Sequence, residues 1–422
     1  MRKPILSEVD QGPTMNGAYQ ATDDSRIDEQ RLLDAALAIV AEEGLGGLTL
    51  RPLAKRIGVS VASFSRQIGS KDQLLDHLIG LASRADEAEL APPLNVLTAF
   101  GTLPRETLID ITEDVLRMRC GPGRPRAHFK CELVQAAAFN PRLRPALAAW
   151  IAVDHHFFQI LAERCEPPVS FDLAGALCAF AIDDAARALT MDDFDAYHWL
   201  RREGIKRLWH GLFAGKPTPT NPLFERALTT LESNNAFPIW TVRPLTSARD
   251  RSFGEIVASI IMDSGADAIT HREVARRAGT PHSSLAYHYP LQDDLVELGM
   301  QAVIEMVREG SEAAMDGRQL PVVAGQLAYA SFAVALAAAR RPNLGPIVRE
   351  MRRRRGENLL PWLRRHVPGK PNIDMANVQT MSSVLIGSIL LTRAGMRYAA
   401  LVPQQLMAQL GDWPDPLLQL RA

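Results

Sequence analysis

The sequence has few of the residues that would indicate a metal or redox protein. Its four cysteines form no C-x-x-C pair, which argues against a zinc ribbon or a redox motif and favours buried free thiols. They are Cys120, Cys131, Cys165 and Cys178. A glycine-rich phosphate loop, a G-x-S-x-G motif and an H-E-x-x-H motif are also missing from the sequence. We therefore expect neither a cofactor nor an enzymatic activity.

An excess of charge of one sign is lacking, and so is a long apolar run. The 47 basic and 48 acidic side chains leave a formal net charge of -1, so the overall charge selects no partner. The most apolar run, SVLIGSILL from Ser383, is followed by Arg393 and Arg397 and is too short to cross a bilayer. We expect a cytoplasmic protein that does not bind membranes.

What the sequence does contain is helical periodicity, without the alternation that is typical of strands. An all-α fold is therefore predicted. Residues 1–24 lack this periodicity and predict a disordered arm, after which Ser25 and Asp28 form an S-x-x-D cap. Beyond the first short helices, long helices are expected near residues 104–119, 124–139, 143–165, 171–190, 194–213, 294–313, 319–340, 344–366, 374–396 and 403–411.

The sequence contains an internal repeat, in which two short segments match each other at a spacing of 221 positions. Both segments have glycines at predicted helix breaks, a threonine at a predicted helix start, and an alanine where two helices would cross closely. The matched positions include Gly44 and Gly265, Thr49 and Thr270, Arg51 and Arg272, Ala54 and Ala275, Gly58 and Gly279, and Ser63 and Ser284. Two short helices joined by a glycine turn predict a helix-turn-helix, whose second helix can enter a major groove of DNA.

The first segment, from about residue 27 to 85, resembles the DNA-binding domain of TetR-family transcription regulators. The resemblance rests on an Ala-Ala helix, Gly44, Thr49, the Gly-Val-Ser at Gly58, and Lys71 before Leu-Leu. The second segment, from about residue 248 to 306, resembles the same family through Thr270, the Ala-Gly at Gly279, and His288-Tyr289-Pro290. The chain thus resembles two TetR-type units in tandem.

The resemblance implies a fold and a division of the chain. Each helix-turn-helix domain would be followed by a helical bundle that binds an effector and forms a dimer interface. The predicted units are 1–24 (disordered arm), 25–85 (first helix-turn-helix domain), 86–214 (first bundle), 215–247 (linker with one short helix after Pro222), 248–306 (second helix-turn-helix domain) and 307–422 (second bundle).

The two copies depart from the family pattern at different positions. The family tyrosine is Ser65 in the first copy and Ala286 in the second; the family histidine survives only as His288, and the family lysine only as Lys71. Residues 26–84 hold eight basic and seven acidic side chains, whereas residues 249–297 hold five and eight. The second copy should therefore gain less from counterion release on DNA.

The residues expected to bind DNA lie in the two repeated segments. They have hydroxyl, amide, aromatic or basic side chains, which can reach phosphates or base edges. They are Thr49, Arg51, Ser60, Ser63, Ser65, Arg66, Gln67 and Lys71 in the first copy, and Thr270, Arg272, His282, Ser284, Tyr287, His288 and Tyr289 in the second. A tandem chain would pair unlike heads on an operator with unequal half-sites, either as an internal pseudo-dimer or within a homodimer.

Candidates for lining an effector pocket lie in the first bundle. The alternative interpretation is that these residues only pack in the core of the bundle. They are Trp150, His155, Phe158, Asp183 and Arg187. For Asp183, Asp184 and Arg187 an internal ion pair or an interface position is the favoured interpretation. The run MRRRR, which ends at Arg355, is interpreted as a solvated helix face.

Taken together, the residues and the resemblance predict a DNA-binding transcription regulator. We expect a repressor that a small-molecule effector releases from its double-stranded DNA operator. Two alternatives stay open at this point: a protein-interaction module whose heads no longer bind DNA, and a helical enzyme.

Overall fold

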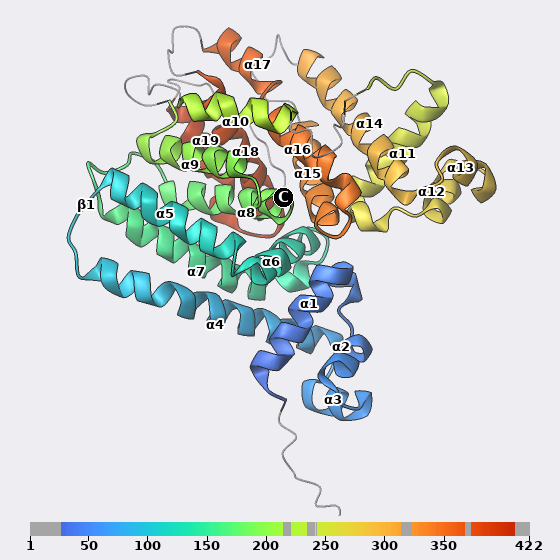
Figure 1. Cartoon of the computed structure of the whole chain (residues 1–422), viewed down its shortest axis with the longest axis horizontal. Helices are drawn as coiled ribbons and strands as arrows, with labels where there is room; N and C mark the ends of the chain where they lie inside the picture. Colours follow the sequence, from blue (N-terminus) through green and yellow to red (C-terminus); the bar gives the residue numbers. More distant parts are fainter. Residues whose placement is uncertain are drawn as a thin grey trace, which may run out of the picture.

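The computed structural model describes residues 27–213, 221–233, 241, 243–313, 323–367 and 373–409. Within these residues nearly all regular structure is helical (Figure 1), as predicted, and a single pair of two-residue parallel strands joins β1 (Leu103–Pro104) to β2 (Cys165–Glu166). The predicted arm at 1–24 and the predicted cap at Ser25 lie outside the described residues. Asp28 is the N-cap of the first helix, and its side chain accepts a hydrogen bond from Gln30 N.

The first head consists of α1 (Glu29–Gly47), α2 (Leu50–Ile57) and α3 (Val61–Ile68), followed by the start of α4 (Lys71–Thr98). Helix α1 turns out of helical geometry at Gly44, where φ is 71°. The predicted capping box of Ser70 and Gln73 starts α4. Helix α4 then runs on through Pro92 and Pro93, so one continuous helix links the head to the bundle behind it.

The first bundle is built from long helices whose apolar faces meet in one core. They are α5 (Arg105–Cys120), α6 (Arg124–Ala137), the 3-10 turn η1 (Pro141–Leu143), α7 (Arg144–Glu163), α8 (Leu173–Met191) and α9 (Asp195–His210). Each lies within a few residues of a predicted helix. All four cysteines are buried and free, as the sequence indicated.

Helix α10 (Pro222–Ser233) is the predicted short helix of the linker. Its buried Phe224 and Ala227 pack against Ala196 and Leu200 of α9. Helix α10 also contacts the second half of the chain at α16. The linker helix is therefore part of the packed structure rather than a free tether.

The second half begins with the helices around α12 and α13, here called the second head, and continues with the helices packed behind them. Its elements are α11 (Ala248–Ser264), η2 (Ala266–Ala268), α12 (His271–Ala278), α13 (His282–His288), α14 (Gln292–Ala313), α15 (Val323–Arg340), η3 (Pro342–Leu344), α16 (Gly345–Arg353), α17 (Leu359–His366), α18 (Met375–Arg393), η4 (Arg397–Ala400) and α19 (Val402–Ala408). The single helix predicted over 344–366 is wrong, because the chain breaks between α16 and α17 at Gly356, where φ is 84°.

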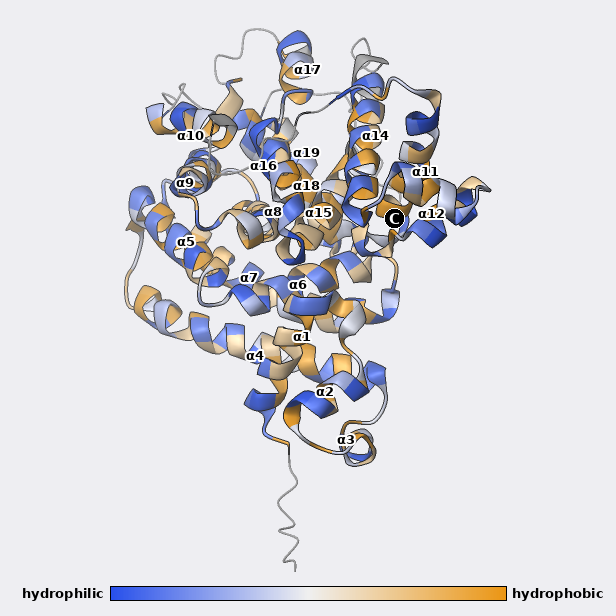
Figure 2. Cartoon of the chain, turned by 45° about the vertical axis from the view of Figure 1, so that its right-hand side comes forward, coloured by the Kyte–Doolittle hydropathy of each residue, from blue (hydrophilic) through white to orange (hydrophobic). Residues whose placement is uncertain are grey.

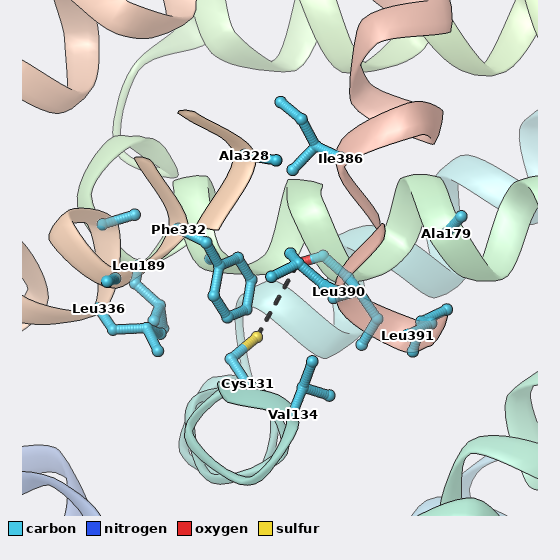
Figure 3. Packing of buried hydrophobic residues seen from close by; sticks show 14 of the residues in the cluster. Cys131, Val134, Ala179, Leu189, Ala328, Phe332, Leu336, Ile386, Leu390 and Leu391 are labelled. Carbon is cyan, nitrogen blue, oxygen red and sulfur yellow. Dashed lines mark hydrogen bonds between the residues drawn. The ribbon is translucent and has the colours of Figure 1, made fainter. Parts of the chain in front are cut away.

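The two halves join where α8 lies against α18. A side chain at Gly387 would place its Cβ only 1.8 Å from the backbone oxygen of Ala179, so the two helices approach backbone to backbone. Figure 3 shows Cys131 of α6, Phe332 of α15 and Leu390 of α18 meeting in the same apolar core. Because the core is continuous across the joint, the halves form one packed body.

Helix α18 is long and apolar enough to cross a membrane by length and composition alone, but most of it is buried inside the molecule. It contacts α8, α9 and α15, which makes it a core helix. By contrast, Figure 2 shows hydrophilic residues on the outer turns of α2 and α12, the short helices that precede α3 and α13.

Candidate nucleic-acid interface

The first head holds α3 against the rest of the domain by one side chain. Phe64 is fully buried, and Leu53 and Ile57 of α2 form the surface beneath it. Gly58, with φ at 76°, makes the left-handed turn between the two helices. This turn is the feature that favours glycine, and it leaves the side of α3 opposite Phe64 open to solvent.

Most residues predicted to bind DNA in the first head lie on that open side or beside it. Those with exposed side chains are Arg51, Ser60, Ser65, Arg66, Gln67 and Lys71, whereas Thr49 and Ser63 are half-buried. Ser60 is also the N-cap of α3, since its hydroxyl accepts a hydrogen bond of 3.1 Å from Ser63 N. Thr49 precedes α2 as its N-cap residue without a side-chain cap bond.

The charges of the first head are unevenly paired. Arg56 pairs with Glu42 of α1 at 2.5 Å, and this contact lowers the pKa of Glu42. The exposed cations Arg51, Lys55, Arg66 and Lys71 of α2, α3 and the start of α4 have no ion pair among the described residues, and neither does the exposed Arg31 of α1. The sequence did not predict Lys55 as a DNA-binding residue, because its position in α2 belongs to no recognised motif. Free cations around an exposed helix can each replace a counterion on DNA.

The second head shares the left-handed glycine turn between its two short helices but differs in how those helices are capped. Thr270 caps α12 by accepting a 3.1 Å hydrogen bond from Glu273 N, and Gly279 turns the chain with φ at 64°. Leu285 is fully buried and anchors α13 as Phe64 anchors α3. The predicted residues with exposed side chains are Thr270, Arg272, His282, Ser284, Tyr287 and His288.

Two of the five arginines in the second head, Arg276 and Arg277, are neutralised within it. Glu273 pairs with Arg276 at 2.7 Å and with Arg277 at 2.8 Å, and these two hydrogen bonds lower the pKa of Glu273 to about 2. Arg249 contacts the ring of His288 at 2.9 Å. Arg272 is exposed and has no ion pair among the described residues. The second head therefore offers fewer free positive charges than the first.

Tyr289 connects α13 to α11. Its hydroxyl donates a hydrogen bond of 2.5 Å to Asp250, and its ring packs edge-on against Phe253. Burial and the hydrogen bond to Asp250 raise the pKa of Tyr289. The position of Tyr289 at the end of α13 thus fixes the helix on its domain, whereas Tyr287, which is 83% exposed, points away from it.

In Figure 1 the first head projects from the bottom of the body and the second from its right-hand side, and the two are connected through three charged residues, the bridging cluster of Glu132, Arg340 and Asp267. Glu132 of α6 accepts hydrogen bonds from Leu45 N at 3.5 Å and from Arg340 at 2.5 Å. Arg340, at the end of α15, also pairs with Asp267 of the second head. A Cβ at Gly44 would lie 3.1 Å from the Arg340 guanidinium. The cluster therefore touches both heads and both bundles.

The residues predicted for an effector pocket do not gather in one place. Trp150 is buried and donates a 2.8 Å hydrogen bond to Asp86, while the ring of His155 lies 4.7 Å from that of Tyr398. Phe158 is 1% exposed in the core. Asp183 and Arg187 form an ion pair of 3.3 Å, and they lie at the joint between the halves.

The interpretation of MRRRR as a solvated helix face is wrong. Arg352 and Arg355 are each 6% exposed. Arg355 pairs with Asp183 of α8, and Arg352 donates a 2.6 Å hydrogen bond to Gln379 of α18. The favoured interpretation of Asp183, Asp184 and Arg187 as internal ion pairs is confirmed, since Asp184 also pairs with Arg201 at 2.7 Å.

Comparison with known proteins identifies the class of the first head. Residues 32–78 match the model of the family of bacterial regulatory proteins described as the tetR family. The match runs from α1 into α4 and so covers the turn at Gly58 and the whole of α3. None of the curated proteins matches the chain. The first head is thus a TetR-type DNA-binding domain, which supports a DNA-binding transcription regulator.

Proposed function

We propose that the chain is a transcriptional repressor in which two unlike helix-turn-helix heads read the two halves of one operator. In this proposal α3 and α13 are the recognition helices, and the chain acts in the cytoplasm by binding rather than by catalysis. The observation that carries the proposal is the exposed α3 with the unpaired cations Arg51, Lys55, Arg66 and Lys71 around it.

The second head is proposed to contribute sequence selection more than affinity. Its cap at Thr270 and its turn at Gly279, which matches the turn at Gly58, support a second reading domain. Because Glu273 neutralises two of its arginines, contacts to bases rather than to phosphates must supply most of its share of binding. His282, Ser284 and Tyr287 are the exposed side chains suited to this role.

Release by an effector requires an element that links the bundle to the heads. We propose that a small molecule bound within the body shifts α6 or α15 and thereby alters the bridging cluster. The support is that Glu132 and Arg340 contact both heads, so a displacement of either helix changes the position of one head relative to the other. We expect an apolar or aromatic effector, because the bundles are rich in apolar side chains.

Binding of purified protein to DNA tests the proposal. Duplexes selected from a random pool would be titrated by fluorescence anisotropy with the wild type, Arg66→Ala and Tyr287→Ala. We expect Arg66→Ala to weaken binding to all sequences, and Tyr287→Ala to change the preferred sequence of one half-site while affecting unselected DNA little. Unchanged affinity and unchanged preference for both variants would reject the proposal.

A protein-interaction module is the second candidate, and the second head favours it most. Tyr287 is 83% exposed and Leu291 is 60% exposed, in a head where Glu273 neutralises Arg276 and Arg277. Aromatic and apolar side chains of this kind are typical of protein contacts. If the second head binds a protein instead of DNA, Tyr287→Ala would leave the selected DNA sequence and the affinity unchanged, while Arg66→Ala would still weaken DNA binding.

A further inference from the structure

Three arginines converge at the joint between the two halves. Arg187 comes from α8, and Arg352 and Arg355 come from the end of α16 and the turn that follows it; together they form the arginine cluster. They are between 1% and 6% exposed. Arginine stays charged in proteins, so three positive charges are held here in a largely dry environment.

One carboxylate serves this cluster directly. Asp183 pairs with Arg187 at 3.3 Å and with Arg355. The adjacent Asp184 is already engaged, since it accepts hydrogen bonds from Tyr197 at 2.6 Å and from Arg201 at 2.7 Å.

The wider group keeps an excess of positive charge. Arg201 shares Asp184 with Tyr197 and also pairs with Asp192 at 3.0 Å. When these neighbours are included, four guanidinium groups face three carboxylates in the described structure. The excess is one positive charge.

Arg352 carries that excess. Its hydrogen bond goes to the neutral amide oxygen of Gln379 at 2.6 Å, and no carboxylate pairs with it among the described residues. Arg187 is better served by Asp183 and by Ser331, but its Nε is buried without a hydrogen-bond partner. Burial, together with the nearby Arg355, lowers the pKa of Arg352 to about 10.

An unpaired buried guanidinium is costly, because a charge removed from water needs a partner of opposite sign. The surrounding hydroxyl and amide groups of Ser331, Ser383 and Gln379 are dipoles and cannot cancel a net charge. Arg352 is 6% exposed, so the residue is not completely enclosed by the protein. An anion that arrives there would meet donors that are already in place.

We propose that the joint between the halves is a binding site for a small monoanion, with a carboxylate as its chemical class, held by Arg352. A planar carboxylate matches the parallel N–H donors of a guanidinium, and a single negative charge matches the excess of one. The inference goes beyond the proposed function and does not depend on DNA binding by either head.

Thermal unfolding without DNA tests the site, with acetate as the probe and acetamide as its uncharged counterpart. The variant Arg352→Gln removes the unpaired charge and keeps a side chain that can bond to Gln379. Arg353→Gln is the matched control, because Arg353 pairs with Glu350 on its own helix at 2.8 Å. All three proteins experience the same ionic strength, so the difference between them isolates the site from general salt effects.

We expect acetate, but not acetamide, to raise the Tm of the wild type and of Arg353→Gln saturably by about 2 °C or more. Arg352→Gln should show no such rise, and its Tm without acetate should equal or exceed that of the wild type. An equal acetate effect in Arg352→Gln would overturn the proposal, and so would the absence of any effect in the wild type. If Arg352→Gln does not fold, Arg352→Lys keeps the charge, and failure of acetate to stabilise that variant would also overturn it.

Discussion

The salt dependence of DNA binding should reveal which head supplies the electrostatic affinity. In the first head Arg51, Lys55, Arg66 and Lys71 are exposed and unpaired. If each neutralises one phosphate, log K falls against log salt with a slope of about -3.6 from this head alone. Raising the salt from 50 to 200 mM should then weaken binding by a factor on the order of 150.

Single substitutions make the reasoning sharper. Lys71→Ala should make the slope shallower by about 0.9, which is the share of one phosphate contact. Arg56→Ala is the matched control, since it removes the same charge from the same head but from a residue that already pairs with Glu42 at 2.5 Å. Fluorescence anisotropy titrations at five salt concentrations measure both slopes. If Arg56→Ala and Lys71→Ala change the slope equally, net charge rather than contact explains binding, and the reasoning is refuted.

Three further predictions concern the second head, the bridging cluster and the first bundle. Glu273→Gln frees Arg276 and Arg277, so DNA affinity should rise and the salt slope should steepen by up to about 1.8 in the same titrations; weaker binding would contradict the charge argument. Arg340→Met leaves the buried Glu132 carboxylate without its partner and should lower the free energy of unfolding by about 3 kcal/mol in urea, whereas Glu132→Gln with Arg340→Met should lose clearly less; equal losses would show that the pair does not couple. In the first bundle, burial raises the pKa of Asp86, but Lys130 and Arg119 outweigh burial and hold the pKa well below its usual value. Asp86 therefore stabilises the fold above the unfolded pKa near 4, and this contribution is lost as the pH falls below it; urea midpoints from pH 7 to 3 should drop more for the wild type than for Asp86→Asn, and parallel curves would contradict this.

Features that depend on neighbouring residues in the sequence were predictable. Gly58 and Gly279 mark turns because left-handed geometry favours glycine, and Ser70 with Gln73 forms a capping box from residues three positions apart. The helix-turn-helix of the first head and the long helices of both bundles follow from such local signals together with apolar periodicity.

Features that depend on residues far apart in the sequence were not predictable. Arg352 and Arg355 have the pattern of a solvated helix face, and they are buried only because Asp183 and Gln379 come from other helices of the fold. Likewise, the sequence shows that Arg340 ends a helix, but not that it reaches Glu132. Charged residues have no periodic signature for burial, so tertiary packing decides it.

The sequence predicted the short helices around Gly58 and Gly279, whereas the difference in free charge between them emerged only with the side chains in place. Glu273 aligns with Pro52 of the first copy under the shift of 221 positions, and in the structure it neutralises two arginines of its own helix. A count of charged residues shows only that the second head has a net negative charge. The ion pairs in the structure show which of its cations remain free to contact DNA.

Footprinting of one selected duplex, combined with the stoichiometry of the complex, tests the central claim most directly. The account predicts that one chain protects two unequal half-sites about 34 to 36 Å apart along the helix axis. It also predicts that Arg66→Ala weakens protection of one half-site and Tyr287→Ala that of the other. A palindrome occupied by two chains, each through its first head alone, would contradict the account.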